Sequence, residues 1–412
     1  MALTGAFGLR ASRSLSVTSR ECDDGAVTAT FDSSTAGSRP AQPASHIAGT
    51  LDFDGQVDLV SDAVAEEDPQ QGLVPAKNSS AASTKVSEIA TALGMLRPTL
   101  PEAMSHQPTE LVGVSDGAWR QLLGLYDAGG HSKLFAKAFA NGRVFARSDR
   151  GLRQRHPNTV EWSGPFQARW TSAIPADLRV DDVYLVSCKY DSKILHNTSP
   201  ARFFESRLTE SLRSTGPWFD SIALEQYQVY FAAVRSHYGL TGVSADVTKL
   251  DAADRSILKQ ALPRQLPDEL SAEQAAFCHA MATASVERWR KSVTSLRQRQ
   301  EFALSLLRIP QAIYFLLGVD GPTSLRFKVA SRWDWAKQYE VRELKMSGRD
   351  GAMQPTVDWR LVVTDTAVHT DVVVDGHVEV RWSHGRFLGA PEAKVKLDTP
   401  LCAVPGYLAL DD

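Results

Sequence analysis

The pattern of hydrophobic and polar residues divides this 412-residue chain into four parts. Residues 1–100 are rich in Ser, Thr, Ala, Gly and Asp and show no sustained hydrophobic period, so we expect a disordered, low-complexity N-terminal extension. The remainder predicts an α/β (α+β) protein. We expect a mixed-sheet core over 108–215, a helical region over 216–320 and an antiparallel β segment over 321–412.

Hydrophobic residues at helical spacing on either side of Gly129-Gly130 predict two helices that lead into the core. Short β-type runs follow, and the acidic pair Asp181-Asp182 predicts a tight turn between the last two. A further helix is expected after Ser199, a good N-cap residue, with Pro200 at its first position. The predicted core strands are Thr159–Ser163, Asp177–Val180 and Val183–Cys188.

The last quarter of the chain alternates hydrophobic and polar residues and predicts short strands. Within it, Asp375-Gly376 lies between the alternating runs Val368–Val374 and His377–Ser383. An Asp-Gly pair in such a position is typical of a β-hairpin turn, so we expect two separate strands there. No apolar run is long enough to cross a membrane.

Charged residues gather at the end of the predicted core strands. Asp177 begins one strand, Lys189 ends the next and Glu205 lies on the helix after it. Such residues can converge at one edge of a sheet. Carboxylates there can hold a hard cation, and a lysine can orient an attacking water or stabilise charge on a phosphate.

These residues resemble the PD-(D/E)xK nuclease superfamily. The match reads Pro175-Ala176-Asp177, nine residues, Ser187-Cys188-Lys189, fifteen residues, and then Glu205. Because Ser187 replaces the usual second acid, the chain resembles the restriction-endonuclease subgroup with an SxK motif and a displaced helix glutamate.

The resemblance implies a restriction-endonuclease-like core and a role for each motif residue. Asp177 would be the principal ligand of Mg²⁺ or Mn²⁺, Glu205 the second metal ligand and Lys189 the catalytic lysine. Glu161, on the preceding strand, would be an additional acid of the site. The alternative stays open that this is a buried strand ending in a solvated lysine, with ordinary surface charges around it.

A run of arginines precedes the first core strand and suits the phosphate backbone of DNA, although a solvated loop would explain it equally well. The formal net charge of −3 at pH 7 means that any nucleic-acid binding is local. The run consists of Arg143, Arg147, Arg150, Arg153 and Arg155.

The four cysteines lie far apart with no CxxC pair, which excludes a zinc ribbon and favours a reducing cytoplasm. We therefore expect a cytoplasmic, Mg²⁺-dependent DNA endonuclease acting in restriction or defence, without a membrane partner. A non-catalytic nucleic-acid- or protein-binding scaffold with a nuclease-like core stays open, as do an RNA substrate and a homo-oligomer.

Overall fold

The computed structural model describes residues 18–21, 27–30, 80–164, 174, 176–190, 194–206, 208–263, 265–382 and 385–410. The chain divides into two compact units, Met1–Ser79 and Ser80–Asp412. In the first, strands β1 (Thr18–Glu21) and β2 (Val27–Thr30) pair in antiparallel fashion. The rest of that unit, and with it most of the predicted disordered extension, lies outside the described residues.

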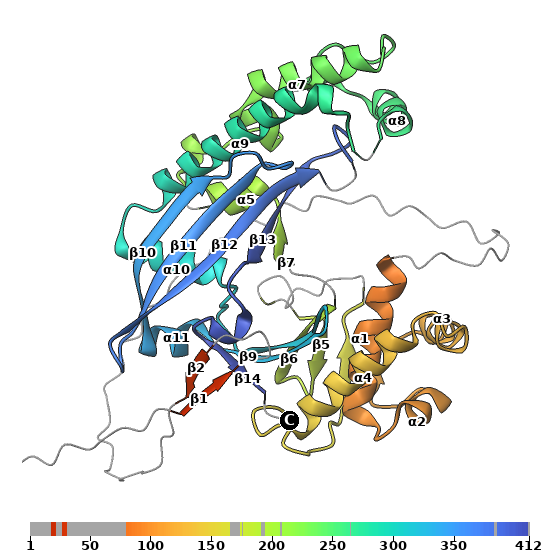
Figure 1. Cartoon of the computed structure of the whole chain (residues 1–412). Coiled ribbons are helices and arrows are strands. Elements are labelled where there is room, and N and C mark those ends of the chain that lie inside the picture. Colours follow the sequence, from red (N-terminus) through yellow and green to blue (C-terminus); the bar gives the residue numbers. More distant parts are fainter. Residues whose placement is uncertain are drawn as a thin grey trace, which may run out of the picture. The chain divides into compact units, whose positions relative to one another are not determined.

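The second unit combines helices with two sheets, so the predicted α/β class is confirmed (Figure 1). Its helices are α1 (Ser80–Leu96), α2 (Leu100–Ser105), α3 (Asp116–Asp127), α4 (Ser132–Arg147), α5 (Pro200–Glu205), α6 (Trp218–Ile222), α7 (Leu224–His237), α8 (Ala252–Ala261), α9 (Ser271–Ser292), α10 (Leu296–Leu306) and α11 (Arg332–Gln338). Among the described residues, no helix is long and apolar enough to cross a membrane.

A seven-stranded mixed sheet has the order β14-β9-β8-β6-β5-β4-β3. Two of its pairs, β3 with β4 and β6 with β8, are parallel, and the others are antiparallel. Its strands are β3 (Leu111–Val112), β4 (Val160–Trp162), β5 (Leu178–Val180), β6 (Tyr184–Tyr190), β8 (Tyr314–Asp320), β9 (Thr323–Val329) and β14 (Tyr407–Ala409). The three predicted core strands are thus present as the meander β4-β5-β6.

The turn between β5 and β6 is the tight acidic turn that the sequence predicts. Asp181 and Asp182 both have positive φ, 48° and 59°, as the two central residues of a type I′ turn require. The Asp181 carboxylate accepts hydrogen bonds from the backbone amides of Asn158 and Thr159, at 2.7 and 3.0 Å. This turn therefore fixes the register of the meander.

Helices α1 and α4 cover one face of the seven-stranded sheet and cross each other closely. A Cβ atom on Gly94 would lie 2.1 Å from the Phe139 carbonyl oxygen, and one on Gly142 would lie 2.0 Å from that of Thr91. Only glycine allows the two backbones to approach in this way. Helix α1 is buried from Val86 to Leu96, so the prediction of disorder is wrong for Ser80–Leu96.

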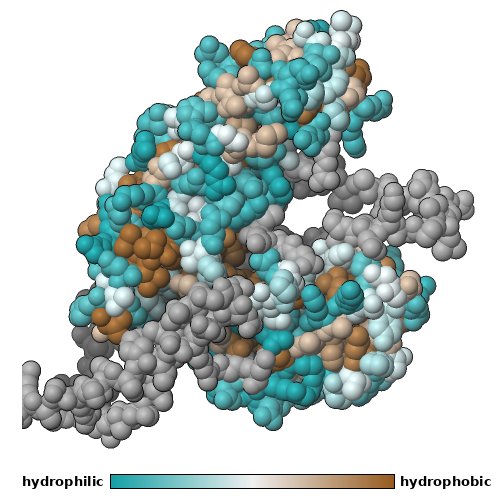
Figure 2. Space-filling model, in the orientation of Figure 1, coloured by the Kyte–Doolittle hydropathy of each residue, from teal (hydrophilic) through white to brown (hydrophobic). Residues whose placement is uncertain are grey.

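An antiparallel five-stranded sheet has the order β10-β11-β12-β13-β7. Helices α9 and α10 lie against β10, and α7 packs on α9 (Figure 1). The strands are β7 (Ile194–Thr198), β10 (Tyr339–Gly348), β11 (Thr356–Asp365), β12 (Thr370–Trp382) and β13 (Pro391–Leu397). Most of the surface seen in Figure 2 is hydrophilic, with separate hydrophobic patches.

The hairpin predicted at Asp375-Gly376 is wrong, because both residues lie inside the continuous strand β12. Gly376 pairs with Trp359, and a Cβ atom on Gly376 would lie 2.1 Å from the Trp359 ring. Glycine is thus needed here to make room for a large neighbouring side chain, not to form a turn.

The linear division into three consecutive segments is also wrong, because each sheet contains strands from more than one of these segments. Strand β7, from the predicted core segment, belongs to the five-stranded sheet. Strands β8, β9 and β14, from the helical and C-terminal segments, belong to the seven-stranded sheet.

Candidate active site

Asp177 lies immediately before β5, where its carboxylate is held against β6. Its Oδ2 atom accepts hydrogen bonds from the Cys188 backbone amide at 2.6 Å and from Ser187 Oγ at 3.4 Å. Burial raises the pKa of Asp177, while Lys189, these two donors and Arg308 act in the opposite direction. The serine in the second acid position therefore helps to orient Asp177.

Glu88, on α1, is the second carboxylate of this cluster and was not among the site residues predicted from the sequence. The glutamate is only 9% exposed, and Trp162 Nε1 on β4 donates a hydrogen bond to its Oε2 at 2.6 Å. Burial and the neighbouring charge of Asp177 raise the pKa of Glu88 to about 8, although Trp162 and Lys189 oppose the shift.

Lys189 is the cation of the cluster, since its charge acts on both Glu88 and Asp177. Its position on β6 is secured by Tyr190, the next residue. The Tyr190 hydroxyl lies 2.7 Å from Thr91 Oγ1 on α1 and accepts a hydrogen bond from Asn141 Nδ2 on α4 at 3.2 Å. The two helices thus hold the end of β6 that carries Lys189.

The structure gives Glu205 other partners than the predicted ones. Its Oε2 atom accepts hydrogen bonds from the backbone amide and hydroxyl of Ser214, both at 2.6 Å, and Oε1 lies 3.4 Å from Arg288 Nε. In the described part of the chain, no contact joins Glu205 to Asp177 or Lys189. The predicted convergence of Glu205 with Asp177 and Lys189 is therefore not seen, and the carboxyl group whose pKa Asp177 raises is that of Glu88.

Glu205→Ala is expected to lower the free energy of unfolding by about 2–4 kcal/mol, because it leaves the Ser214 amide and the Arg288 guanidinium without their acceptor. Urea denaturation measures the loss, which should be the same with and without Mg²⁺. A loss seen only in the presence of Mg²⁺ would return Glu205 to the list of metal ligands.

The remaining predicted site residue of the sheet, Glu161, pairs across strands with Arg179, whose Nε donates to its Oε2 at 2.7 Å. Glu161 thus belongs to an ion pair between the neighbouring strands β4 and β5.

The predicted DNA-binding arginines mostly support the chain around the end of α4. Arg143 donates to the Arg97 carbonyl, Arg150 to that of Ala409 and Arg153 to that of Asp149. Arg155 donates to the Leu152 carbonyl and contacts the Tyr184 hydroxyl, whereas Arg147 is exposed at the end of α4. DNA binding by these residues stays a prediction.

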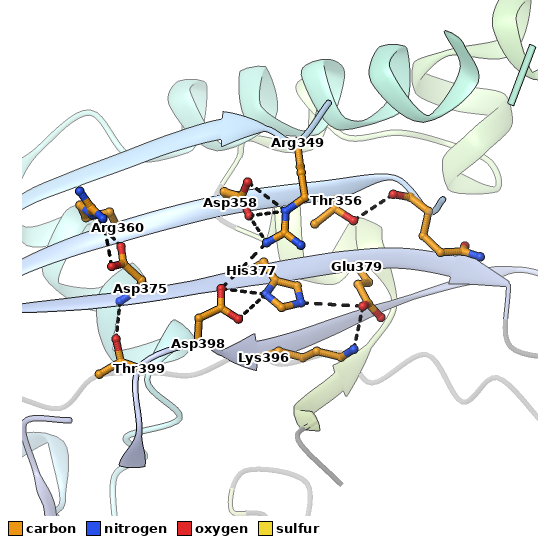
Figure 3. A network of polar contacts seen from close by, with 11 residues as sticks. Arg349, Thr356, Asp358, Arg360, Asp375, His377, Glu379, Lys396, Asp398 and Thr399 are labelled. Atoms are coloured by element: carbon orange, nitrogen blue, oxygen red, sulfur yellow. Dashed lines mark hydrogen bonds and ion pairs between the residues drawn. The ribbon is translucent and has the colours of Figure 1, made fainter. Parts of the chain in front are cut away.

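A second group of charged residues lies on one face of strands β11, β12 and β13 and near their ends (Figure 3). Arg349 Nη2 lies 2.6 Å from Asp358 Oδ1, and Arg360 Nε lies 2.7 Å from Asp375 Oδ1. His377 Nδ1 lies 2.8 Å from Asp398 Oδ1. Opposite charges on neighbouring strands compensate one another, so this network stabilises strand pairing.

The residues around Asp177 offer two carboxylates that could bind a magnesium ion. Among the described residues there is no group of three or more His, Cys, Asp or Glu side chains that could hold a metal ion. Two carboxylates remain, Glu88 and Asp177, whose mutual repulsion a cation would relieve. Mg²⁺ is commonly held by one or two carboxylates, with water and substrate phosphate as its other ligands.

The raised pKa of Glu88 predicts a specific pH dependence of stability. Between its ordinary pKa near 4.5 and its raised pKa of about 8, folded Glu88 keeps a proton that the unfolded chain has lost. The stability conferred by this proton is complete below pH 4.5 and disappears as the pH rises towards 8. Relative to Glu88→Gln, the unmodified protein should lose up to about 1.4 kcal/mol per pH unit in this range.

Denaturant unfolding of both proteins at pH 5 to 9 measures this difference. Mg²⁺ should reduce the slope, because a bound cation replaces the proton. Parallel pH profiles for the two proteins would show that Glu88 ionises normally.

Comparison of the chain with protein-family models, with curated proteins and with solved structures finds no match.

Proposed function

We propose that the protein is a metal-dependent phosphodiesterase that cleaves DNA internally. The observation that carries this proposal is the cluster of Glu88, Asp177 and Lys189. These residues come from a helix and two neighbouring strand segments. Asp177 acts to raise the pKa of Glu88, and Lys189 acts to lower the pKa of both carboxyl groups. A pair of buried carboxylates with a lysine is chemistry suited to a divalent cation and a phosphate.

The order of elements supports the resemblance to PD-(D/E)xK nucleases. A helix, the meander β4-β5-β6 and, after a long helical connection, the parallel strand β8 follow one another along the chain. Asp177 precedes the second strand of the meander, and Lys189 lies on the third. In this proposal Glu88 supplies the second carboxylate that the motif lacks at Ser187.

Each residue has a defined task in the proposed reaction. Glu88 and Asp177 would hold Mg²⁺, which when bound would supply Lewis-acid stabilisation of the phosphate. Lys189 would orient the attacking water and stabilise negative charge that develops on the phosphate. Ser187 and the Cys188 amide keep the Asp177 carboxylate in position.

Incubation of the purified protein with supercoiled plasmid, with Mg²⁺ or with EDTA, tests the proposal. We expect nicking or linearisation with Mg²⁺ alone, and its loss in Glu88→Gln. Arg360→Gln is a matched control, because Arg360 lies in the ion-pair network of the other sheet. If the unmodified protein cleaves neither duplex DNA, single strands nor RNA with Mg²⁺ or Mn²⁺, the binding scaffold becomes the better interpretation.

A further inference from the structure

A groove of about 830 Å³ lies where α9 and α10 meet the five-stranded sheet, and it has no role in the site described above. Its lining residues come from these two helices, from strands β10, β11 and β12 and from the segments next to them. The volume falls within the range of about 300–1,000 Å³ that is typical of ligand-binding clefts.

The lining of this groove carries more positive than negative charge. Its three acidic residues, Asp358, Asp375 and Asp398, are all engaged in the ion-pair network of Figure 3. A formal surplus of two positive charges therefore remains. The five cationic lining residues are Arg290, Arg299, Lys345, Arg349 and Arg360.

Arg290 and Arg299 carry this surplus. Arg290, in the last turn of α9, donates to the Met346 carbonyl at 3.4 Å, and Arg299, near the start of α10, donates to the Arg342 carbonyl at 3.3 Å. Both hydrogen bonds are long, and in the described part of the chain neither guanidinium group forms an ion pair. Because a guanidinium group has five N–H donors, both side chains can bind a further acceptor.

The position of Arg299 argues against a purely structural role. Helix α10 begins at Leu296 and has no acidic residue in its first turn, whereas Arg299 is its fourth residue. The partial positive charge of a helix N-terminus makes a cation there unfavourable and a bound anion favourable. The exposed side chain of Arg297 adds a second cation to the same turn.

The cations of the groove are spread too widely for a single phosphate group. Lys345 and Arg349 are four residues apart along extended chain, which corresponds to about 13 Å. Lys345 also lies directly opposite Arg360 in the β10–β11 ladder, where like charges oppose strand pairing. This distribution suits a chain of phosphates better than one small anion.

We propose that this groove holds the phosphate backbone of the DNA substrate, with Arg290 and Arg299 as direct phosphate contacts. Guanidinium groups donate strong, geometrically defined hydrogen bonds to phosphate oxygens. Such contacts position a duplex and carry no sequence information. The inference rests on the proposed function for the identity of the ligand, and it places the duplex on a surface outside the cluster of Glu88, Asp177 and Lys189.

Arg290→Gln combined with Arg299→Gln tests this inference by DNA binding, with Ca²⁺ in place of Mg²⁺. At about 0.1 M salt, affinity for a fluorescent duplex of about 30 base pairs should fall by about 10–100-fold, and the slope of log affinity against log salt should become smaller by about two. The loss should be the same for duplexes of unrelated sequence. Replacing both arginines by lysine keeps the charges and should preserve the slope.

Two control variants carry matched changes. Lys249→Gln combined with Lys337→Gln removes the same net charge outside the groove. Arg360→Gln combined with Asp375→Asn removes an ion pair inside the groove and leaves its net charge unchanged. Both should bind the duplex with the normal slope. The melting temperature of the double glutamine variant at Arg290 and Arg299 should change by no more than about 2 °C, because only two long hydrogen bonds are lost.

Equal salt slopes for the unmodified protein and the double glutamine variant would overturn the inference, as would the absence of duplex binding by both. Binding of inorganic tripolyphosphate through the two arginines, without an effect of these arginines on duplex affinity, would assign the groove to a small polyphosphate and also overturn it. A protein that binds DNA through both arginines and does not cleave it would contradict the proposed function and support the groove as inferred.

Discussion

Replacing Lys189 by alanine should lower the single-turnover rate of DNA cleavage by at least about 10³-fold, the largest catalytic effect that we expect from one substitution. The lysine acts on charge that develops during the reaction, so its removal affects the transition state more than the bound substrate. DNA affinity should therefore change by no more than about threefold. The unfolding free energy should also fall, because Glu88 and Asp177 lose the cation that opposes the rise of their pKa values.

Lys396→Ala is the control for this measurement. Lys396 also projects from a strand and pairs with Glu379 at 2.7 Å, but in the five-stranded sheet. It should leave cleavage unaffected. A Lys189→Ala protein that cleaves at the normal rate would remove the lysine from the mechanism, whereas one that fails to bind DNA would show that it acts in affinity.

Deletion of Met1–Leu100 should abolish cooperative folding of the remaining chain, whereas deletion of Met1–Ser79 should change its melting temperature by no more than about 2 °C. The longer deletion removes α1, whose Val86, Ile89, Leu93 and Leu96 are at most 3% exposed. Each such side chain contributes about 1.5–3 kcal/mol through burial. Four of them approach the whole stability of a typical protein, about 5–15 kcal/mol.

Calorimetry or circular dichroism of the two truncated proteins measures this difference. The shorter deletion should also retain DNA cleavage, because it keeps Glu88. Cooperative melting of the longer deletion near the normal temperature would show that α1 is not part of the core. A large loss in the shorter deletion would show that the first unit stabilises the second.

The sequence predicted the central meander well because each strand carries its own hydrophobic signal. Asp177 and Lys189 follow directly from that meander, and Lys189 opposes the rise of the Asp177 pKa. Glu88 escaped notice because Ser, Thr and Ala dominate its surroundings. The spacing of Val86, Ile89, Leu93 and Leu96 nevertheless has a helical period and would have identified α1 as amphipathic.

Glu205 shows the opposite error. Its spacing from Lys189 agrees with the motif, and the predicted helix with Ser199 as N-cap is present. Spacing along the chain does not determine which neighbours a helix meets, however. In the fold, α5 packs against α9, and the glutamate therefore meets Arg288. Pairing of distant strands, such as β7 with β13, likewise leaves no signal in local periodicity.

Strands of the two sheets alternate along the chain, and this order restricts recombination within the gene. The seven-stranded sheet draws on segments from Leu111 to Ala409, and the five-stranded sheet on segments from Ile194 to Leu397. A single crossover anywhere between β3 and β14 would therefore separate strands of the seven-stranded sheet. The two sheets therefore cannot recombine as separate modules, and we expect them to be inherited together.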